Sequence, residues 1–128
     1  MKDHGVFKLA LENNILIVEG RGPWNKEALK ISFDNAKMML NKKEKWGIIA
    51  VMYGEPVYTP DAAEMLIERI KYEKTHGRTA TAFILTNSIS PELGKRHLSD
   101  LCSKADETFQ FFNRVIDAEI WMKSLLSE

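Results

Sequence analysis

The side chains that could carry out chemistry are few, and they lie far apart in the sequence. His4, His76 and His97 fall on three separate predicted elements and lack the spacing of a metal-binding motif. The sequence also contains none of the glycine-rich loops that bind phosphates or dinucleotides. We therefore predict neither a metal site nor a cofactor.

Cys102 is the only cysteine, so the chain cannot form an internal disulfide, as is typical of proteins in a reducing cytosol. Its predicted place is the apolar side of a helix, beside Leu98, Leu101 and Ala105. No neighbouring charge is placed to lower its pKa, which favours a buried structural thiol over a nucleophile.

Glu64 and Glu68 lie four positions apart on a predicted helix, and a pair of carboxylates can perform acid–base chemistry. They alternate with Arg69 and Lys71, however, which is typical of ion pairing on a solvated helix face. An enzyme that uses Glu64, His97 or Cys102 is the least favoured alternative, because no base–nucleophile pair is visible. We predict that the protein is not an enzyme.

Composition narrows the class of protein further. A chain of 128 residues with 45% hydrophobic and 28% charged residues fits a single domain over 1–128. Lys plus Arg and Asp plus Glu are 18 each, so no net charge attracts nucleic acid. No apolar run approaches the ~20 residues of a membrane span, and the N-terminus lacks the apolar core of a signal peptide. We expect a cytoplasmic protein without integral membrane association.

The N-terminal half is predicted to form a hairpin, a helix and a buried strand. Two β-rich runs at 6–11 and 15–20 are joined through Asn13 and Asn14, which tolerate a hairpin turn. Residues 21–24 form a predicted turn in which Trp24 is the one aromatic that could be exposed for a partner. Asn25 caps a helix that runs to about residue 40, and the uncharged run 46–53 suits a strand buried on both faces.

The C-terminal half alternates helices and strands. Helices are predicted over 60–76, 90–105 and 115–126, and strands over 79–86 and 108–112; Gly77 ends the first of these helices. The element order is β-β-α-β-α-β-α-β-α. This order predicts an α/β fold with a mixed, mostly parallel sheet and packed helices.

The best candidate site is the predicted turn at 54–58 together with the start of the helix that follows it. Thr59 can cap that helix, Pro60 suits its first position, and Asp61 favours its positive end. The backbone N–H groups there could hold a phosphate or carboxylate. The simpler alternative is an ordinary cap with a loop that tucks its side chains inward. The predicted binding residues are Tyr53, Glu55, Pro56, Val57, Tyr58, Thr59 and Asp61.

The C-terminal segment carries a family resemblance. The aromatic run 109–112, followed by Asp117-Ala118 and Trp121-Met122, resembles the ending of the small stand-alone bacterial SpoIIAA-like proteins. These are similar to STAS domains of sulfate transporters and anti-sigma-factor antagonists, and have been likened to the CRAL-TRIO lipid-transfer fold. The resemblance implies a SpoIIAA/STAS-like fold and a protein that is not an enzyme.

In the anti-sigma antagonists a serine in an Asp-Ser-Ser-Gly motif is phosphorylated at the start of the corresponding helix. Thr59 falls near that position, so the resemblance implies Thr59 as a phosphorylation site. This chain lacks the motif, and Pro60 directly follows the hydroxyl residue, which weakens the case for a phospho-switch.

Our leading hypothesis is a binding or regulatory module whose site at 54–62 takes a protein partner or a small apolar or anionic ligand. The alternative is a carrier or sensor of a lipid-like or apolar molecule, since methionine adapts to irregular ligands. Core filling explains the same methionines more simply, and a homodimer stays an open alternative for a domain of this size. The methionines in question are Met38, Met39, Met65 and Met122.

Overall fold

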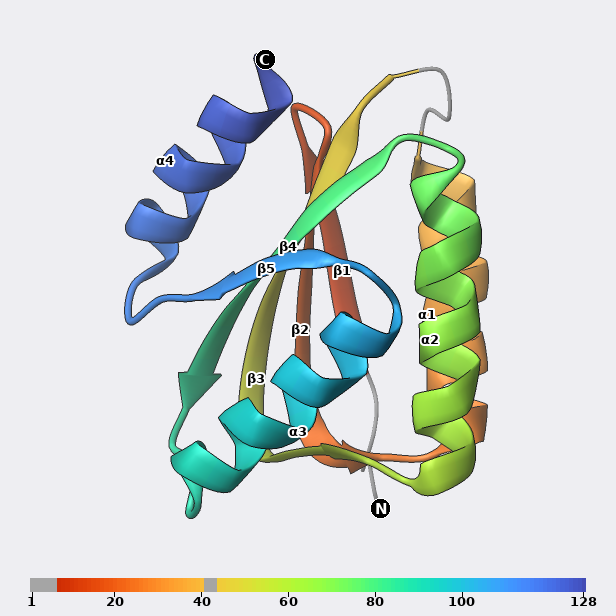
Figure 1. Ribbon diagram of the computed structural model, residues 1–128, viewed down its shortest axis with the longest axis vertical. Helices are drawn as coiled ribbons and strands as arrows, with labels where there is room; N and C mark the ends of the chain where they lie inside the picture. The colour runs from red at the N-terminus through yellow and green to blue at the C-terminus, as the bar shows by residue number, and fades with distance from the viewer. Residues whose placement is uncertain (1–6, 41–43) are drawn as a thin grey trace.

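Five strands and four helices alternate along the chain in a computed structural model that describes residues 7–40 and 44–128 (Figure 1). The predicted first residue of the hairpin, Val6, and His4 lie outside the described residues. The elements are β1 (Phe7–Glu12), β2 (Ile15–Trp24), α1 (Lys26–Met39), β3 (Trp46–Tyr58), α2 (Pro60–Lys74), β4 (Arg78–Thr86), α3 (Pro91–Lys104), β5 (Thr108–Phe111) and α4 (Val115–Leu126).

The strands form one mixed sheet in the order β1-β2-β3-β4-β5. β1 runs antiparallel to β2, and β2 through β5 are joined by parallel pairs. Asn13 and Asn14 make the hairpin turn with φ values of 49° and 68°, a left-handed conformation that asparagine tolerates. The structure therefore confirms the predicted α/β class and the predicted mixed sheet.

The predicted turns at 21–24 and 54–58 are wrong, because both segments are strand. They pair with each other at the ends of β2 and β3, where Gly22 lies opposite Gly54 and Trp24 opposite Tyr58, with a bulge between them. Gly54 has a φ of +72°, which lets the strand bend and continue. Trp24 is 0% exposed, so the expectation of an exposed aromatic there is also wrong.

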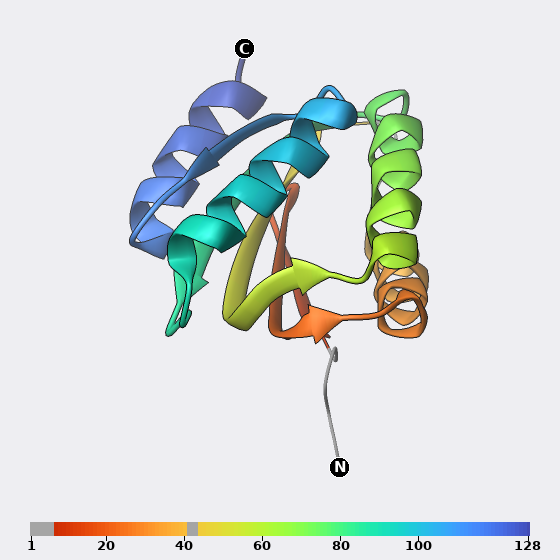
Figure 2. The same cartoon turned by 60° about the horizontal axis from the view of Figure 1, so that its bottom comes forward.

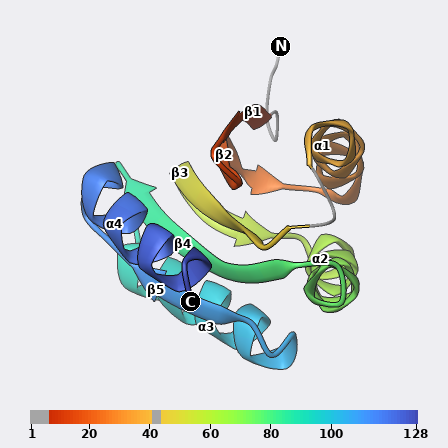
Figure 3. The same ribbon diagram turned by 90° about the horizontal axis from the view of Figure 1, so that it is seen from above.

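Helix α4 lies on one side of the sheet, opposite α1 and α2 (Figure 3). Along β3 the side chains alternate, and Ile49 and Val51 point toward α4. Ala118 and Met122 of α4 are both 0% exposed, as the spacing of the apolar residues in this helix predicts.

The other face of the sheet is covered by the remaining three helices. Ala50 and Met52 of β3 pack with Leu98 and Cys102 of α3. Helices α1 and α2 lie side by side (Figures 1 and 2), and Ile70 of α2 belongs to a cluster that includes residues of α3. These helices form the layer that encloses the candidate site.

Several helix ends form as the sequence predicts. Asn25 caps α1, since its Oδ1 accepts a hydrogen bond from the Ala28 N–H at 2.9 Å. Gly77 follows α2 with a φ of +97°, a conformation that favours glycine. Cys102 is 1% exposed, so the predicted buried thiol is confirmed.

Close packing of α3 on β3 depends on Gly94. A Cβ atom at this position would overlap the ring of the buried Pro56. We expect Gly94→Ala to lower the free energy of unfolding by about 1–2 kcal/mol, because overpacking outweighs the higher helix propensity of alanine. Urea unfolding measures the change.

Ser103→Ala is the matched control, since Ser103 lies on the exposed side of the same helix. It should change the free energy of unfolding by less than about 0.5 kcal/mol. If Gly94→Ala is as stable as the unmodified protein, α3 does not depend on this close approach.

Candidate functional site

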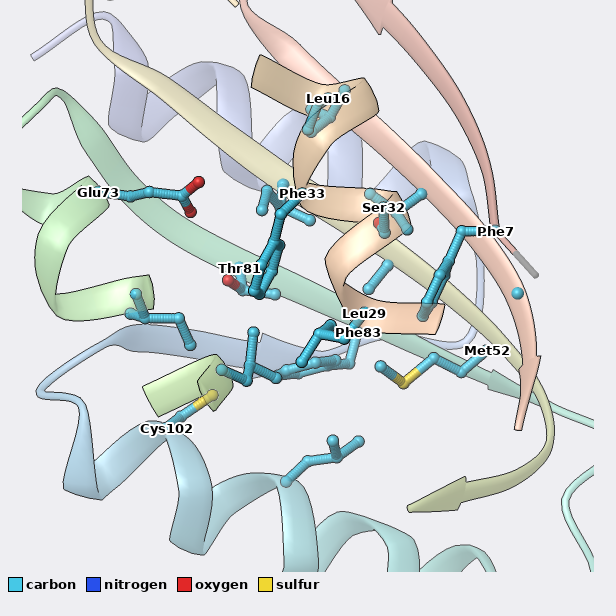
Figure 4. A pocket seen from close by; sticks show the side chains of 18 of the residues that line it. Phe7, Leu16, Leu29, Ser32, Phe33, Met52, Glu73, Thr81, Phe83 and Cys102 are labelled. Atoms are coloured by element: carbon cyan, nitrogen blue, oxygen red, sulfur yellow. The ribbon is translucent and has the colours of Figure 1, made fainter. Parts of the chain in front are cut away.

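A partly open cavity of about 70 Å³, measured as the space open to the centre of a water molecule, lies between the sheet and helices α1, α2 and α3. A single water needs roughly 10–15 Å³ by the same measure, so the cavity can hold a small molecule. Figure 4 shows Leu29 and Ser32 of α1, Phe7 of β1, Met52 of β3 and Cys102 of α3 around this space.

Small residues of the sheet and of the helices that cover it leave this space open. Gly20 of β2, Ala50 of β3 and Ala36 of α1 all line the cavity. A Cβ atom on Gly20 would be 2.6 Å from the nearest ring carbon of Phe7, so even one methyl group there would crowd the wall. The apolar lining makes the cavity suitable for an apolar body.

Aromatic rings close one part of the wall. Phe7 stacks on Trp24 with ring centroids 5.4 Å apart, and Trp24 contacts Tyr58 with centroids 5.0 Å apart. Within the described residues the Tyr58 hydroxyl makes no hydrogen bond, whereas its backbone N–H donates to His97 Nε2 at 3.1 Å. Burial raises the pKa of Tyr58, so this hydroxyl stays neutral at the cavity wall.

A buried ionic network forms the polar part of the wall. Arg78 donates through Nε to Glu107 Oε2 at 2.6 Å and through Nη1 to Glu73 Oε1 at 2.7 Å. Its Nη2 donates to Thr81 Oγ1 at 2.8 Å, and the Thr81 hydroxyl donates to Glu107 Oε2 at 2.7 Å. Arg78, Glu73 and Thr81 line the cavity, so the site has one polar end.

The charges in this network stabilise one another. Burial raises the pKa of Glu107, but the charge and hydrogen bonds of Arg78 and the Thr81 hydroxyl outweigh burial, and the pKa lies below its usual value. Burial also works against the charge on Arg78, yet its two carboxylate partners hold its pKa above the usual value. Glu107 is therefore ionised at neutral pH although its side chain is 0% exposed.

The structure does not bring the predicted binding residues together. Tyr53 lies on the α4 side of the sheet, where its hydroxyl donates to Glu19 at 3.3 Å. Tyr58 packs on the opposite side with the α2 and α3 clusters, and Pro56 is buried beneath α3. Polar replacement of Tyr58 would therefore disturb the core, in line with the alternative in which this segment tucks its side chains inward.

Thr59 and Asp61 do lie together, at the start of α2. The Thr59 hydroxyl does not form the predicted cap bond to the backbone; it donates instead to Asp61 Oδ1 at 2.7 Å. The same oxygen accepts the Ala62 N–H at 2.9 Å. The pKa of Asp61 is lowered chiefly by the Thr59 hydrogen bond. The Asp61 carboxylate thus occupies the position where an external anion was expected.

None of the four methionines named for a lipid carrier lines the cavity, although Met65 lines a surface groove between α1 and α2. Met38 is 88% exposed and Met122 belongs to the core beneath α4, whereas Met52 lines the cavity. The ionic network around Arg78 was not predicted from the sequence either. One signal was available in the sequence. Arg78 lies between a helix-ending glycine and an apolar strand, where its charged side chain can be buried only if a carboxylate pairs with it.

Comparison of the chain with known protein families, curated proteins and solved structures found no match. Among residues 7–40 and 44–128, no three His, Cys, Asp or Glu side chains are grouped so that they could hold a metal ion. No helix in the same residues is long and apolar enough to cross a membrane.

Glu107→Gln tests the ionic network. We expect the variant to lose about 3 kcal/mol of unfolding free energy at pH 7, because Arg78 loses a buried partner. The folded-state pKa of Glu107 lies below its ordinary 4.5, so its contribution is present above that pH and disappears as pH falls through the folded pKa. The difference in unfolding free energy between the variant and the unmodified protein should therefore become smaller below pH 4.5, which urea unfolding at several pH values measures.

The exposed pair Lys104–Asp100, at 3.1 Å, provides the control. Asp100→Asn should cost less than about 0.5 kcal/mol at either pH. If the loss of unfolding free energy caused by Glu107→Gln stays constant as the pH falls, the charge of Glu107 does not stabilise the fold.

Proposed function

We propose that this protein binds a small, largely apolar molecule in the cavity between the sheet and helices α1, α2 and α3, without transforming it. The observation on which this proposal rests is the partly open apolar cavity of about 70 Å³ with a polar network at one part of its wall. Binding sites for small molecules combine these features: an apolar lining and a few polar groups that orient the ligand.

The reactive groups near the cavity support binding over catalysis. Burial raises the pKa of Cys102 to about 12, so at neutral pH this residue is a thiol and a poor nucleophile. His97 accepts a backbone hydrogen bond from Tyr58, and burial lowers its pKa. A base–nucleophile pair of the kind that activates a cysteine is not formed by these residues.

A route of entry lies between α1 and α2. Phe33 lines the cavity and also an open surface groove of about 440 Å³ between these helices. The guanidinium of Arg69 lies 5.1 Å from the centre of the Phe33 ring and pairs with Glu73 at 3.0 Å. Rotation of the Phe33 side chain would connect the groove to the cavity.

The proposed function corresponds to the carrier or sensor alternative rather than to the site at 54–62. The hairpin followed by alternating helices and strands supports the proposed SpoIIAA/STAS-like relationship. A protein partner, a phosphorylated Thr59 and a homodimer stay predictions. For Thr59, the neighbouring Asp61 carboxylate would repel a phosphate, which favours the ligand-binding proposal over the phospho-switch.

Ser32→Leu tests the cavity as a binding site. Ser32 is 8% exposed and lines the cavity, so a leucine there would fill the space without exposing apolar surface. We expect at least tenfold weaker toluene binding, with a free energy of unfolding that is unchanged or raised by about 0.5–2 kcal/mol. Saturable shifts of cavity methyl signals in NMR titrations measure the binding.

Asn35→Leu introduces the same side chain on the exposed face of α1 and should leave toluene binding unchanged. Two results would contradict the proposal: an unmodified protein that shows no saturable toluene binding, or a folded Ser32→Leu variant that binds toluene as tightly as the unmodified protein.

A further inference from the structure

The guanidinium of Arg78 has hydrogen-bonding capacity that the protein does not use. Arginine carries five N–H donors. Three of them bond to Glu107, Glu73 and Thr81, one each from Nε, Nη1 and Nη2, which leaves one N–H on each terminal nitrogen without a partner among the described residues. The Arg78 side chain is 4% exposed, so bulk solvent has little access to these groups.

The residue that carries these donors belongs to the wall of the cavity. Arg78 lines it together with Glu73, Thr81 and Trp46, whose ring lies 5.9 Å from the guanidinium carbon. Glu107, on the other hand, does not line the cavity, although its carboxylate holds Nε. A molecule in the cavity can therefore contact Arg78, whereas Glu107 is not part of the wall.

The charge around Arg78 limits which acceptor suits these donors. Two carboxylates already lie 2.6 and 2.7 Å from the guanidinium nitrogens, and their side chains are 0% and 9% exposed. The compensating cations Lys74 and Arg69 are more exposed, at 26% and 25%. A further carboxylate would face Glu73 at close range in a poorly solvated space, whereas a neutral oxygen would not be repelled.

We propose that the ligand has an apolar body and a neutral hydrogen-bond acceptor at one end, such as an aldehyde, ketone or ester carbonyl, which binds to the unused N–H groups of Arg78. This inference rests on the proposed binding function and adds the chemical class of the ligand. The rest of the cavity wall contacts the apolar body.

Three probes of similar size separate the alternatives: toluene has no acceptor, benzaldehyde has a neutral carbonyl and benzoate has a charged carboxylate. We expect benzaldehyde to bind the unmodified protein about tenfold more tightly than toluene, because it gains a hydrogen bond to a charged donor. Benzoate should bind more weakly than toluene. NMR titration measures the three affinities, and the Arg78 guanidinium signals should shift with benzaldehyde and not with toluene.

The variants test whether Arg78 is responsible. Arg114→Lys is the matched control, because Arg114 does not line the cavity and its side chain is 71% exposed beside Asp117. This variant should keep the tenfold preference for benzaldehyde over toluene. Arg78→Lys keeps the positive charge but not the two terminal nitrogens of the guanidinium. It should reduce the preference for benzaldehyde over toluene to below about threefold. If this variant does not fold, the probe comparison and the Arg78 signals of the unmodified protein decide.

The outcomes distinguish the two proposals. If toluene binds and benzaldehyde binds no more tightly, the cavity is a binding site but the Arg78 inference is wrong. If benzoate binds most tightly, the acceptor is an anion and the inference of a neutral group is overturned. If none of the three probes binds, the proposed function itself is wrong.

Discussion

The ion pairs of Arg78 connect the parts of the fold that are far apart in the sequence. Arg78 begins β4, Glu73 belongs to the last turn of α2, and Glu107 lies between α3 and β5. A charge removed from water in this way is tolerated only when it is paired and hydrogen-bonded, and each nitrogen of the Arg78 guanidinium makes one such bond. The relative positions of α2, β4 and the α3–β5 connection therefore depend on this network, and with them one end of the cavity.

The apolar part of the cavity follows from a different constraint. The layer of α1, α2 and α3 has to cover the sheet, but Gly20, Ala36 and Ala50 supply little volume where these layers face each other. Larger side chains, among them Phe7 and Phe33, also line the space. The space persists because the side chains that surround it are supported elsewhere, in the stack of Phe7 on Trp24 and in the contact of Arg69 with Phe33.

Local signals predicted the elements well, and contacts between distant residues account for the errors. The Asn25 cap, the left-handed Gly77 and the buried face of α4 depend on neighbours in sequence, and each could be predicted from the sequence. Pro23 and Gly54 were interpreted as turn residues, yet each lies in a strand that is held by pairing with the other segment. Arg78 and Glu107 are separated by 29 positions, and no sequence spacing indicates that they meet. The cavity depends on packing volumes across three layers, which periodicity alone cannot show.

The cavity links the stability of the fold to ligand binding. Cavities lower stability because the atoms around them lose dispersion contacts, at a cost on the order of 1–2 kcal/mol for a space of this scale. A ligand that fills the space restores those contacts, so binding and folding are linked, and the bound form is the more stable one. The polar end strengthens this argument, since a purely accidental packing defect would not be expected beside a buried guanidinium with unused donors. A ligand that contacts both Phe33 of α1 and Arg78 of β4 would stabilise the position of α1 relative to the sheet, and such a coupling would suit a sensor as well as the proposed carrier.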